Sequence, residues 1–526
     1  MDGGSGAVRL HATHMHARAR HYRRPGGPWD RGPLDAGFAR GSGGVVDHGD
    51  RLDVVAVEDL VDRLAGRLRA AGARRGRAVG WQLPNGAAAL LMYRACWRLG
   101  AVAAPLHHRL GPAEVEGALA QVDPAVVLAA ADLPAAGVAG ARVVDAPCGA
   151  AMLLAHFADA DPVPVAEGAA RGSDLAVALF TSGSTGTPKA ALHTHRALGY
   201  KAALMVDVHG LDGDDVVLMP APLAHISGLL NGVLIPAAAG IPAVLMGAWD
   251  PDEGLARIEA ERVTFMGAPP VFFSQMAGSA RFSAERVASL RLVSTGGASV
   301  SPAFVEATAE AFGCRVKRTY GSTEAPTITT SGPDDAPALA RDTDGRCVGE
   351  AELSVRDPGT DAPVGPGAIG ELWLRGPELF VGYADAASTA RVIGQPGGWY
   401  RSGDLGSVDQ DGWLVVTGRL SDIIIRAGEN ISASEVEAVL EAHPAVRHAV
   451  AVGVPDVTLG ERVAAFVEAT GPFDLAACRA WFTERGITRF KTPEFVVRLD
   501  ALPALAAGKP DRAALRAQAA VLAKDG

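Results

Sequence analysis

The chain has few cysteines, and none of them lies at a spacing typical of metal or redox sites. Five occur in 526 residues, without any CxxC pair: Cys96, Cys148, Cys314, Cys347 and Cys478. A sparse, odd-numbered set argues against a disulfide framework and against a structural zinc site. Such a set is typical of proteins in a reducing compartment, so we expect a cytoplasmic location.

The sequence also lacks an apolar leader, a clear membrane span and an excess of positive charge. No apolar run follows the basic residues near the N-terminus, as a secretory signal would require. The uncharged stretch from Ile226 to Trp249 is interrupted by Pro236, Gly240 and Pro242, which favours a buried helix, a turn and a buried strand over a transmembrane helix. The net charge of −10 disfavours nucleic acid as a partner.

The length predicts at least two domains, because single cores rarely grow beyond roughly 300 residues. Short apolar runs alternate with helical stretches, which predicts α/β layers. After about residue 351 the pattern changes to half-exposed strands over 352–356 and 370–375, which indicates a small β subdomain. We therefore predict an α/β fold, with a large N-terminal domain over 1–418 that includes this subdomain and a small mobile α+β domain over 419–526.

A loop rich in hydroxyl groups and glycine directly follows the apolar run at 175–180. Its sequence, over 181–189, is Thr-Ser-Gly-Ser-Thr-Gly-Thr-Pro-Lys. Glycines let the backbone approach an anion, and hydroxyls with a lysine bind its oxygens. Pro188 stands where a Walker A motif requires glycine, so this motif is excluded. Composition alone favours a triphosphate site and an ordinary Ser/Gly surface loop equally.

The loop resembles the signature of the acyl-adenylate-forming superfamily, which includes acyl-CoA synthetases, firefly-type luciferases and nonribosomal peptide adenylation domains. Six further segments resemble this family in the same order, at 222–225, 294–298, 320–324, 400–404, 418–422 with 428–431, and 508–509. The resemblance extends from about Val57 to Arg512 and is strongest to bacterial medium-chain and cyclohexanecarboxylate-type CoA ligases. It implies an AMP-forming acid–thiol ligase that uses ATP, Mg²⁺ and coenzyme A.

The resemblance also assigns the nucleotide site. The phosphate loop would comprise Thr181, Ser182, Gly183, Ser184, Thr185, Gly186 and Lys189. Adenine would lie between Tyr320-Gly321 and Gly297-Ala298, and Thr323 would contact the α-phosphate. Glu324 would hold Mg²⁺, although a carboxylate at a helix start is the alternative. Asp404 would accept hydrogen bonds from the ribose, and Arg419 would reach the ribose or a phosphate.

The implied catalytic residues are Lys509, His225, Thr185 and Glu324. Lys509 would bridge carboxylate and phosphate oxygens in the first half-reaction, although a solvated loop lysine is the ordinary interpretation of its position. His225 would stand at the mouth of an acyl pocket that also includes Ser227, Gly228, Gly267 and Gly296. The pocket is small and apolar and lacks a carboxylate for an amino-acid ammonium group, so we expect an apolar acid.

In this family the small domain rotates about one residue just after the boundary arginine, here Ser421. Ala427-Gly428 replaces the usual Gly-Gly at the edge expected to contact CoA. Two other functions stay open. One is a stand-alone adenylation enzyme that loads a carrier protein, and the other is a non-catalytic acyl- or nucleotide-binding protein. The latter is disfavoured because every expected cation and the Mg²⁺ ligand are present. The oligomeric state is open, and a homodimer is compatible with the sequence.

Overall fold

The computed structural model describes residues 34, 44–47, 50–144, 159–164, 170–181, 188–298, 300–394, 397–427, 429–504 and 510–525. The chain divides into two compact units. Unit 1 comprises Met1–Glu352 and Leu374–Tyr400, and unit 2 comprises Leu353–Trp373 and Arg401–Gly526. The predicted boundary at 418/419 lies inside unit 2, and as the limit of a mobile domain it stays a prediction.

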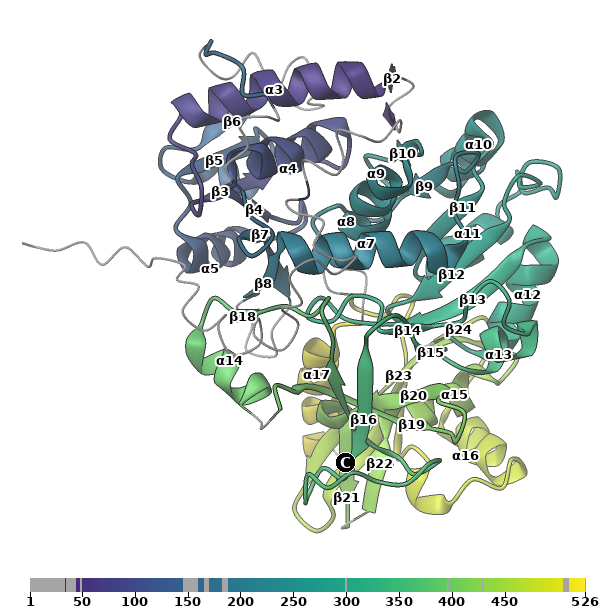
Figure 1. Ribbon diagram of the computed structural model, residues 1–526. Helices are drawn as coiled ribbons and strands as arrows, with labels where there is room; N and C mark the ends of the chain where they lie inside the picture. The colour runs from purple at the N-terminus through teal and green to yellow at the C-terminus, as the bar shows by residue number, and fades with distance from the viewer. Residues whose placement is uncertain are drawn as a thin grey trace, which may run out of the picture. The chain divides into compact units, whose positions relative to one another are not determined.

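Unit 1 contains two large sheets with helices packed on them (Figure 1). The seven-stranded sheet has the order β18-β8-β7-β4-β3-β5-β6. Its strands are β3 (Ala78–Gln82), β4 (Val102–Pro105), β5 (Val126–Ala130), β6 (Arg142–Val144), β7 (Leu175–Thr181), β8 (Lys189–Thr194) and β18 (Gly382–Tyr383). The strands from β3 to β7 are parallel, whereas β8 is antiparallel to both β7 and β18.

The nine-stranded sheet has the order β15-β14-β13-β12-β11-β9-β10-β1-β2. Its strands are β1 (Val45–Asp47), β2 (Asp50–Leu52), β9 (Val217–Met219), β10 (Ala243–Leu245), β11 (Phe265–Ala268), β12 (Leu292–Gly296), β13 (Arg315–Tyr320), β14 (Thr329–Thr330) and β15 (Arg346–Cys347). The central strands, from β1 through β13 in this order, are parallel. Parallel neighbours bring the carboxyl ends of β12 and β13, which carry predicted nucleotide residues, to one edge.

Helices cover both sheets of unit 1. They are α3 (Val54–Ala70), α4 (Ala87–Leu99), α5 (Pro112–Val122), α7 (His195–His209), α8 (Ile226–Leu229), α9 (Ile235–Ala239), α10 (Pro251–Glu261), α11 (Pro270–Ala277), α12 (Pro302–Phe312), α13 (Pro337–Asp342) and α14 (Ala386–Ile393). Every residue of α4 is buried, and α3 lies alongside it (Figure 1). Its two arginines, Arg94 and Arg98, pair with Glu58 of α3. A helix that is buried on all sides requires cover on all sides, so α4 belongs to the centre of this unit.

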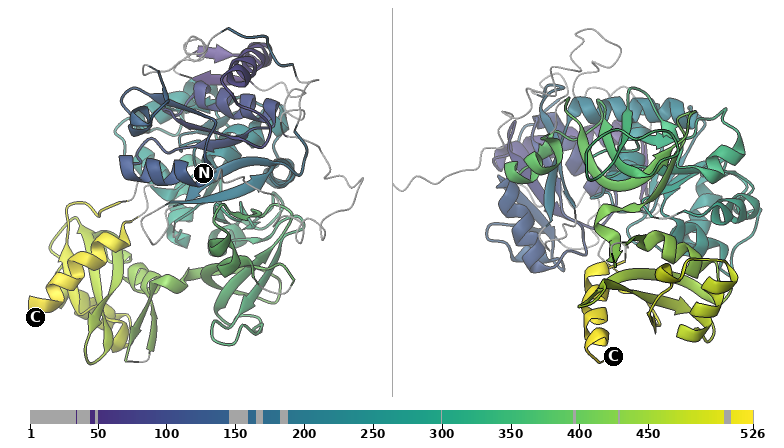
Figure 2. Two further views of the ribbon diagram at one scale, coloured as in Figure 1. Left: turned by 90° about the vertical axis from the view of Figure 1, so that its left-hand side faces the viewer. Right: turned by 90° about the horizontal axis from the view of Figure 1, so that it is seen from below.

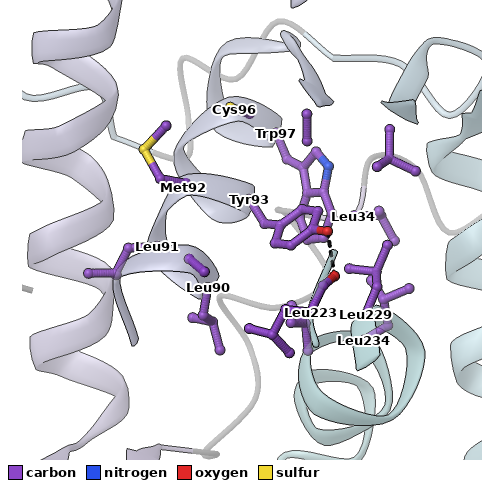
Figure 3. Packing of buried hydrophobic residues seen from close by; sticks show 14 of the residues in the cluster. Leu34, Leu90, Leu91, Met92, Tyr93, Cys96, Trp97, Leu223, Leu229 and Leu234 are labelled. Carbon is purple, nitrogen blue, oxygen red and sulfur yellow. Dashed lines mark hydrogen bonds between the residues drawn. The ribbon is translucent and has the colours of Figure 1, made fainter. Parts of the chain in front are cut away.

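The core of unit 1 extends to the segment that precedes His225. Tyr93 of α4 packs between Trp81, at 4.9 Å, and Trp97, at 5.4 Å between ring centroids. Its hydroxyl donates a hydrogen bond of 2.7 Å to the carbonyl oxygen of Leu223 (Figure 3). Burying a phenol requires such a partner, so this bond fixes both the ring and the turn before His225.

The long uncharged stretch forms the predicted helix, turn and strand. Its helical part runs through α8, a π-helical segment η4 (Leu230–Leu234) and α9, and ends at Gly240 in the left-handed conformation. Strand β10 follows. Among the described residues, no helix is long and apolar enough to cross a membrane. The π-helical insertion, which adds a residue to one turn, was not predicted.

Unit 2 contains two smaller sheets. The four-stranded sheet, in the order β16-β17-β19-β20, comprises β16 (Glu352–Arg356), β17 (Gly370–Arg375), β19 (Tyr400–Val408) and β20 (Leu414–Arg419). The strands β16 and β17 have the predicted bounds. The five-stranded sheet comprises β21 (Ile423–Arg426), β22 (Glu429–Ser432), β23 (Val446–Asp456), β24 (Gly460–Ala469) and β25 (Phe495–Arg498).

Three α-helices flank the five-stranded sheet: α15 (Ala433–Glu441), α16 (Leu475–Glu484) and α17 (Arg512–Asp525). The last, α17, packs on β23, and Figure 2 shows it as the yellow helix beside the yellow-green strands of this sheet. Apolar residues of α15 and α16 form one core with the sheet, including Val436, Leu440 and Phe482. A second cluster joins Leu515 and Ala519 of α17 to the sheet's other apolar residues. The predicted fold class, α/β layers followed by a small α+β unit, is confirmed.

Candidate active site

The phosphate loop connects the two antiparallel strands β7 and β8. Its end residues, Thr181 and Lys189, lie opposite each other in the ladder. The Thr181 hydroxyl donates to the Lys189 carbonyl oxygen at 3.4 Å. Ser182, Gly183, Ser184, Thr185 and Gly186 lie outside the described residues. The structure therefore brings together the two ends of the loop and shows that it closes a hairpin.

Lys189, Tyr383 and Glu324 form a cluster at the end of this hairpin. The Lys189 ammonium lies 5.5 Å from the centroid of the Tyr383 ring, within the range of a cation–π interaction. On the other side, the Tyr383 hydroxyl donates 2.7 Å to Glu324 Oε1. Glu324 is 8% exposed, and no described residue donates to its Oε2. No helix begins at Glu324, so the helix-start alternative for this carboxylate is wrong.

Two buried side chains hold the backbone on either side of Glu324. His193 of β8 donates from Nε2 to the Thr323 carbonyl oxygen at 2.7 Å. Burial lowers the pKa of His193 to about 4, so the ring is neutral at pH 7. Lys201 of α7 donates to the Thr327 carbonyl oxygen at 2.9 Å and pairs with Glu378 at 2.9 Å, where both side chains are fully buried.

Sequence reasoning missed Tyr383, His193 and Lys201. The strand period offers a signal for His193, because Lys189 and His193 are four residues apart in β8 and thus on one face. Tyr383 lies opposite Ala191 on that same face, in the strand β18 that pairs with β8. Lys201 carries no comparable local signal. Its contact depends on the packing of α7 against a loop 126 residues away.

The predicted adenine residues lie at the carboxyl edge of the nine-stranded sheet. Gly296 ends β12 and Tyr320 ends β13, and Gly296 pairs with Thr319 in the parallel ladder. A Cβ at Gly296 would lie 2.3 Å from the Thr319 carbonyl oxygen, so this glycine permits the strands to approach. Gly297 has φ +74°, and no heavy atom lies within 4 Å of an ideal Cβ there. The space beside Gly297, with Ala298 exposed next to it, is where the resemblance places adenine.

His225 caps the first turn of α8 and lies beside two further histidines. Its ring centroid is 4.8 Å from that of His107, and the ring of His107 stacks on that of His108 at 4.4 Å. Burial, together with the neighbouring His225, lowers the pKa of His107 to about 2, so this imidazole is neutral. Asn85 fixes the turn before His225 by accepting from the Leu223 amide and donating to the Ala221 carbonyl oxygen. The two histidines after β4 were not predicted at this site.

The other predicted pocket residues lie on α8 and β11. Gly228 permits close packing, because a Cβ there would lie 2.0 Å from the Pro222 carbonyl oxygen. Ser227 is exposed, and its carbonyl oxygen accepts from the Asn231 carboxamide at 2.9 Å. That carboxamide covers Gly267, with its atoms 3.1–3.3 Å from an ideal Cβ on the glycine. Asn231, which lies in the π-helical segment, is a polar group that the sequence interpretation did not include.

In unit 2, Asp404 and Arg419 face each other across β19 and β20. Arg419 Nε lies 2.8 Å from Asp404 Oδ1, and Asp404 is 5% exposed. The predicted hinge residue Ser421 lies in the short 3₁₀ helix η5 (Leu420–Asp422). Ala427 begins the turn between β21 and β22 with φ +52°. Gly428 and Lys509 lie outside the described residues.

Two family models match the chain. The model for the AMP-binding enzyme matches residues 41–384, and the model for the AMP-binding enzyme C-terminal domain matches residues 435–509. The chain belongs to the AMP-binding enzyme family. The predicted acyl-adenylate-forming membership is thereby confirmed, as is the prediction of an AMP-forming acid–thiol ligase.

Relatives of the same family match nearly the whole chain. A medium-chain fatty-acid–CoA ligase of Escherichia coli (strain K12) is 32% identical over 90% of this chain and 87% of its own. A salicyl-AMP ligase / salicyl-S-ArCP synthetase of Mycobacterium tuberculosis is 33% identical over 90% of this chain and 87% of its own. The crystal structure of ATP-bound MatB from Rhodopseudomonas palustris has a TM-score of 0.83 at 26% identity, over 93% of this chain and 99% of that one. ATP is a substrate of such AMP-binding enzymes, and CoA is a substrate of the CoA ligases among them. The roles of single residues stay predictions.

Proposed function

We propose that this chain converts an apolar carboxylic acid, medium-chain aliphatic or alicyclic, into its CoA thioester through an acyl-adenylate, with release of AMP and pyrophosphate. The observation that carries the proposal is the composition of the helical segment after His225. From Ile226 to Ala239 no residue is charged, and the buried side chains are aliphatic. An amino-acid substrate would bring an ammonium group here without a carboxylate partner, which is costly.

In the first half-reaction, the carboxylate of the acid attacks the α-phosphorus of ATP and pyrophosphate leaves. Negative charge grows on phosphate oxygens, so the protein needs cations and hydrogen-bond donors and no covalent nucleophile. Lys189 and the loop would bind the β- and γ-phosphates, and Thr323 would contact the α-phosphate. Lys509 would bridge the carboxylate and the phosphate.

Glu324 fits a magnesium ligand because its Oε2 is left without a described donor while Tyr383 fixes Oε1. Mg²⁺ is commonly held by one or two carboxylates together with substrate phosphates. When bound, the ion neutralises charge on the phosphates. His193 and Lys201 would act as positioning residues, because each holds a backbone carbonyl of the loop that carries Thr323 and Glu324.

In the second half-reaction a thiol attacks the acyl carbonyl group and AMP leaves. We assign CoA as the acceptor, but the Mycobacterium tuberculosis relative, whose name describes it as a salicyl-S-ArCP synthetase, favours a second candidate. In this alternative the thiol belongs to the phosphopantetheine arm of a carrier protein. The adenylation half-reaction is the same in both cases.

The test is ATP–pyrophosphate exchange with a panel of straight-chain, alicyclic, aromatic and amino acids. For an apolar pocket, kcat/KM should rise about fourfold for each added methylene until the pocket is full, which corresponds to about 0.8 kcal/mol per buried methylene. Glu324→Gln serves as a negative control for adenylation. Exchange with amino acids and not with apolar acids would refute the substrate class. The adenylated acid is then offered CoA or a pantetheinylated carrier protein, and transfer to the carrier alone would support the second candidate.

A further inference from the structure

A cavity of about 160 Å³ lies in unit 1 against the first half of β13. It is lined by Val208, His209, Arg291, Arg315, Lys317 and Pro333, among others, and we call it the cationic cavity. Arg315 and Lys317 precede Tyr320 by five and three residues in the same strand. At roughly 3.3 Å per residue, they lie about 10–16 Å from the edge that carries the predicted adenine residues. The cavity is therefore separate from the candidate active site.

Two of its cations have no carboxylate partner among the described residues. Lys317 is 1% exposed, and its ammonium donates to the carbonyl oxygens of Val208 at 3.1 Å and Ser331 at 2.9 Å. The Arg315 guanidinium likewise donates only to carbonyl oxygens, at 2.5–2.8 Å. Carbonyl dipoles solvate a cation without neutralising it. Arg315 is half-buried, whereas Lys317 is fully buried. A buried charge is normally paired with an opposite charge, so the unpaired Lys317, with a second cation beside it, requires an explanation.

The neighbouring carboxylates are already engaged. Asp215 accepts from Arg291 through both of its oxygens, at 2.5 and 2.7 Å. Asp335 pairs with Arg346 at 2.9 Å. Each of these pairs is neutral as a whole, so neither supplies a full counter-charge to Lys317 or Arg315.

The cavity also leaves hydrogen-bonding groups unused. Arg315 Nε and His209 Nδ1 are buried and have no partner among the described residues. Lys317 has three N–H donors, two of which go to carbonyl oxygens. The volume is several times the roughly 30 Å³ that a water molecule takes in the liquid, which leaves room for an ion of five heavy atoms.

We infer that the cationic cavity binds a small tetrahedral dianion, either free inorganic phosphate or sulfate or the terminal phosphate of a phosphomonoester. Such an ion carries two negative charges, which would neutralise the positive charges of Lys317 and Arg315. Its oxygens accept the hydrogen bonds that Arg315 Nε, His209 Nδ1 and Lys317 can still donate. A bound dianion thus completes the charge balance of this part of unit 1 and stabilises the folded chain.

The experiment measures the Tm of the full chain at constant ionic strength while sodium phosphate, sodium sulfate or glycerol 3-phosphate replaces sodium chloride. The wild-type Tm should rise by about 3 °C at a ligand concentration 100 times Kd and should then continue to rise with the logarithm of the ligand concentration. Lys317→Met keeps most of the side-chain length and removes the charge, so this variant should lose the shift. Arg281→Gln removes an exposed cation elsewhere in unit 1 and should keep it. Equal shifts in all three proteins would show a general salt effect and overturn the inference.

Phosphate could also bind at the nucleotide loop, so Lys189→Ala is measured in parallel. Loss of the shift in Lys189→Ala and not in Lys317→Met would place the ion at the active site and overturn the inference. If Lys317→Met does not fold, a crystal of the wild-type protein soaked in selenate locates the ion directly. An anomalous peak beside Lys317 supports the site, and its absence at saturating selenate refutes it. A Kd at least tenfold lower for glycerol 3-phosphate than for phosphate would identify a phosphomonoester as the ligand, and the reverse order would identify the free ion.

Discussion

Tyr383 separates the two opposite charges that are expected to meet the nucleotide phosphates. Its ring lies beside the Lys189 ammonium and its hydroxyl binds Glu324. Lys189 and Glu324 form no ion pair in the described part of the chain. If they were paired directly, each would have to lose its partner before it could bind a phosphate or a cation. The tyrosine therefore keeps both groups in place and available.

Removal of the Tyr383 hydroxyl should weaken the use of Mg²⁺ while the fold is kept. Tyr383→Phe retains the ring beside Lys189 but loses a hydrogen bond to a carboxylate, which is worth about 1.5–3 kcal/mol. We expect the Mg²⁺ concentration for half-maximal pyrophosphate exchange to rise by about tenfold or more. Tyr200→Phe is the control, because it loses a buried hydroxyl bond to the Glu350 amide, away from Glu324. An unchanged Mg²⁺ dependence in Tyr383→Phe would contradict this role.

Lys317 should make stability depend on pH in a direction opposite to that of a paired lysine. Burial, reinforced by Arg315, lowers the pKa of Lys317 to about 7, whereas Asp335 opposes this shift and Arg291 adds to it. Between pH 7 and the ordinary lysine pKa of about 10.5, the unfolded chain binds more protons than the folded chain. The contribution of Lys317 to the free energy of unfolding therefore rises as the pH increases through this range.

The measurement compares Lys317→Met with the wild type by urea unfolding at pH 7, 8 and 9 in phosphate-free buffer. The free energy of unfolding of the variant should exceed that of the wild type at pH 7, and this difference should become smaller towards pH 9. Because all other titrating groups are shared, the difference between the two proteins isolates Lys317. A difference that does not change with pH would show that this lysine titrates normally in the folded chain.

At the scale of single elements, the hairpin of β21 and β22 contains a residue in an unfavourable conformation. Arg426 pairs with Glu429, so the turn has two residues, and Ala427 takes φ +52°. Two-residue hairpin turns favour glycine, asparagine or aspartate at such positions, and a left-handed residue with a Cβ costs about 1–2 kcal/mol. The same Cβ lies at the edge that the family resemblance assigns to CoA.

Ala427→Gly should therefore raise the free energy of unfolding by about 1 kcal/mol and should also raise the rate of thioester formation. Stability is measured by urea unfolding of the full chain. The rate of the second half-reaction is measured as thioester formation from pre-formed acyl-adenylate. Ala442→Gly is the control, because Ala442 has φ −72° and no strain to relieve. If Ala427→Gly lowers the free energy of unfolding, the left-handed conformation of Ala427 does not destabilise the hairpin.

Elements with a clear local pattern could be predicted from the sequence. The strands β16 and β17 have the expected bounds because they are short and enclosed by glycine and proline turns. The expected half-exposure holds for β16 and is wrong for β17, whose residues are all buried except the half-buried Arg375. The helix, turn and strand of the uncharged stretch followed from Pro236 and Gly240 in the same way. The π-helical insertion at Leu230–Leu234 could not be predicted, because it changes the hydrogen-bond step of a helix without a change in its apolar composition.

The candidate site was predictable only where its residues lie in contiguous motifs. Glu324 and Lys189 belong to such segments, and the structure brings them to one cluster. Three further residues join this cluster through contacts between distant parts of the sequence: Tyr383, His193 and Lys201. His193 and Lys201 bind backbone carbonyl oxygens, and because every residue has such an oxygen, the sequence does not reveal these partners. The contact between Asn231 and Gly267 could not be predicted either, because it depends on how a helix packs on β11.

At the scale of the whole molecule, the family resemblance predicts two arrangements of one chain. The resemblance places Lys509 in the first half-reaction and the Ala427-Gly428 edge in the second. Lys509→Ala should thus abolish adenylation, because it removes a charge needed in that transition state, while thioester formation from pre-made acyl-adenylate should survive far better. Both half-reactions are followed separately, by pyrophosphate exchange and by acyl-CoA product. If Lys509→Ala lowers the rates of both half-reactions equally, Lys509 does not act in the first half-reaction alone.

The reciprocal change is at Ser421, the predicted hinge. Its segment is held within unit 2 by α17, since Arg516 donates to the Ser421 carbonyl oxygen at 3.0 Å and Arg512 lies 3.3 Å from the Asp422 carboxylate. These contacts are few and polar, and partly exposed ion pairs contribute little stability, so they do not prevent a backbone rotation. A hinge needs residues that can absorb large changes of φ and ψ.

Proline at 421 would fix φ near −65°, which lies in the range of the 3₁₀ helix in which Ser421 is found. Ser421→Pro should therefore keep adenylation near the wild-type rate and reduce thioester formation by orders of magnitude. Ser421→Ala, which loses the hydroxyl but keeps a free φ, should behave as the wild type in both half-reactions. The opposite pattern to that of Lys509→Ala is the informative result, because a merely misfolded variant would lose both steps. If Ser421→Pro forms acyl-CoA at the normal rate, the rotation occurs at another residue.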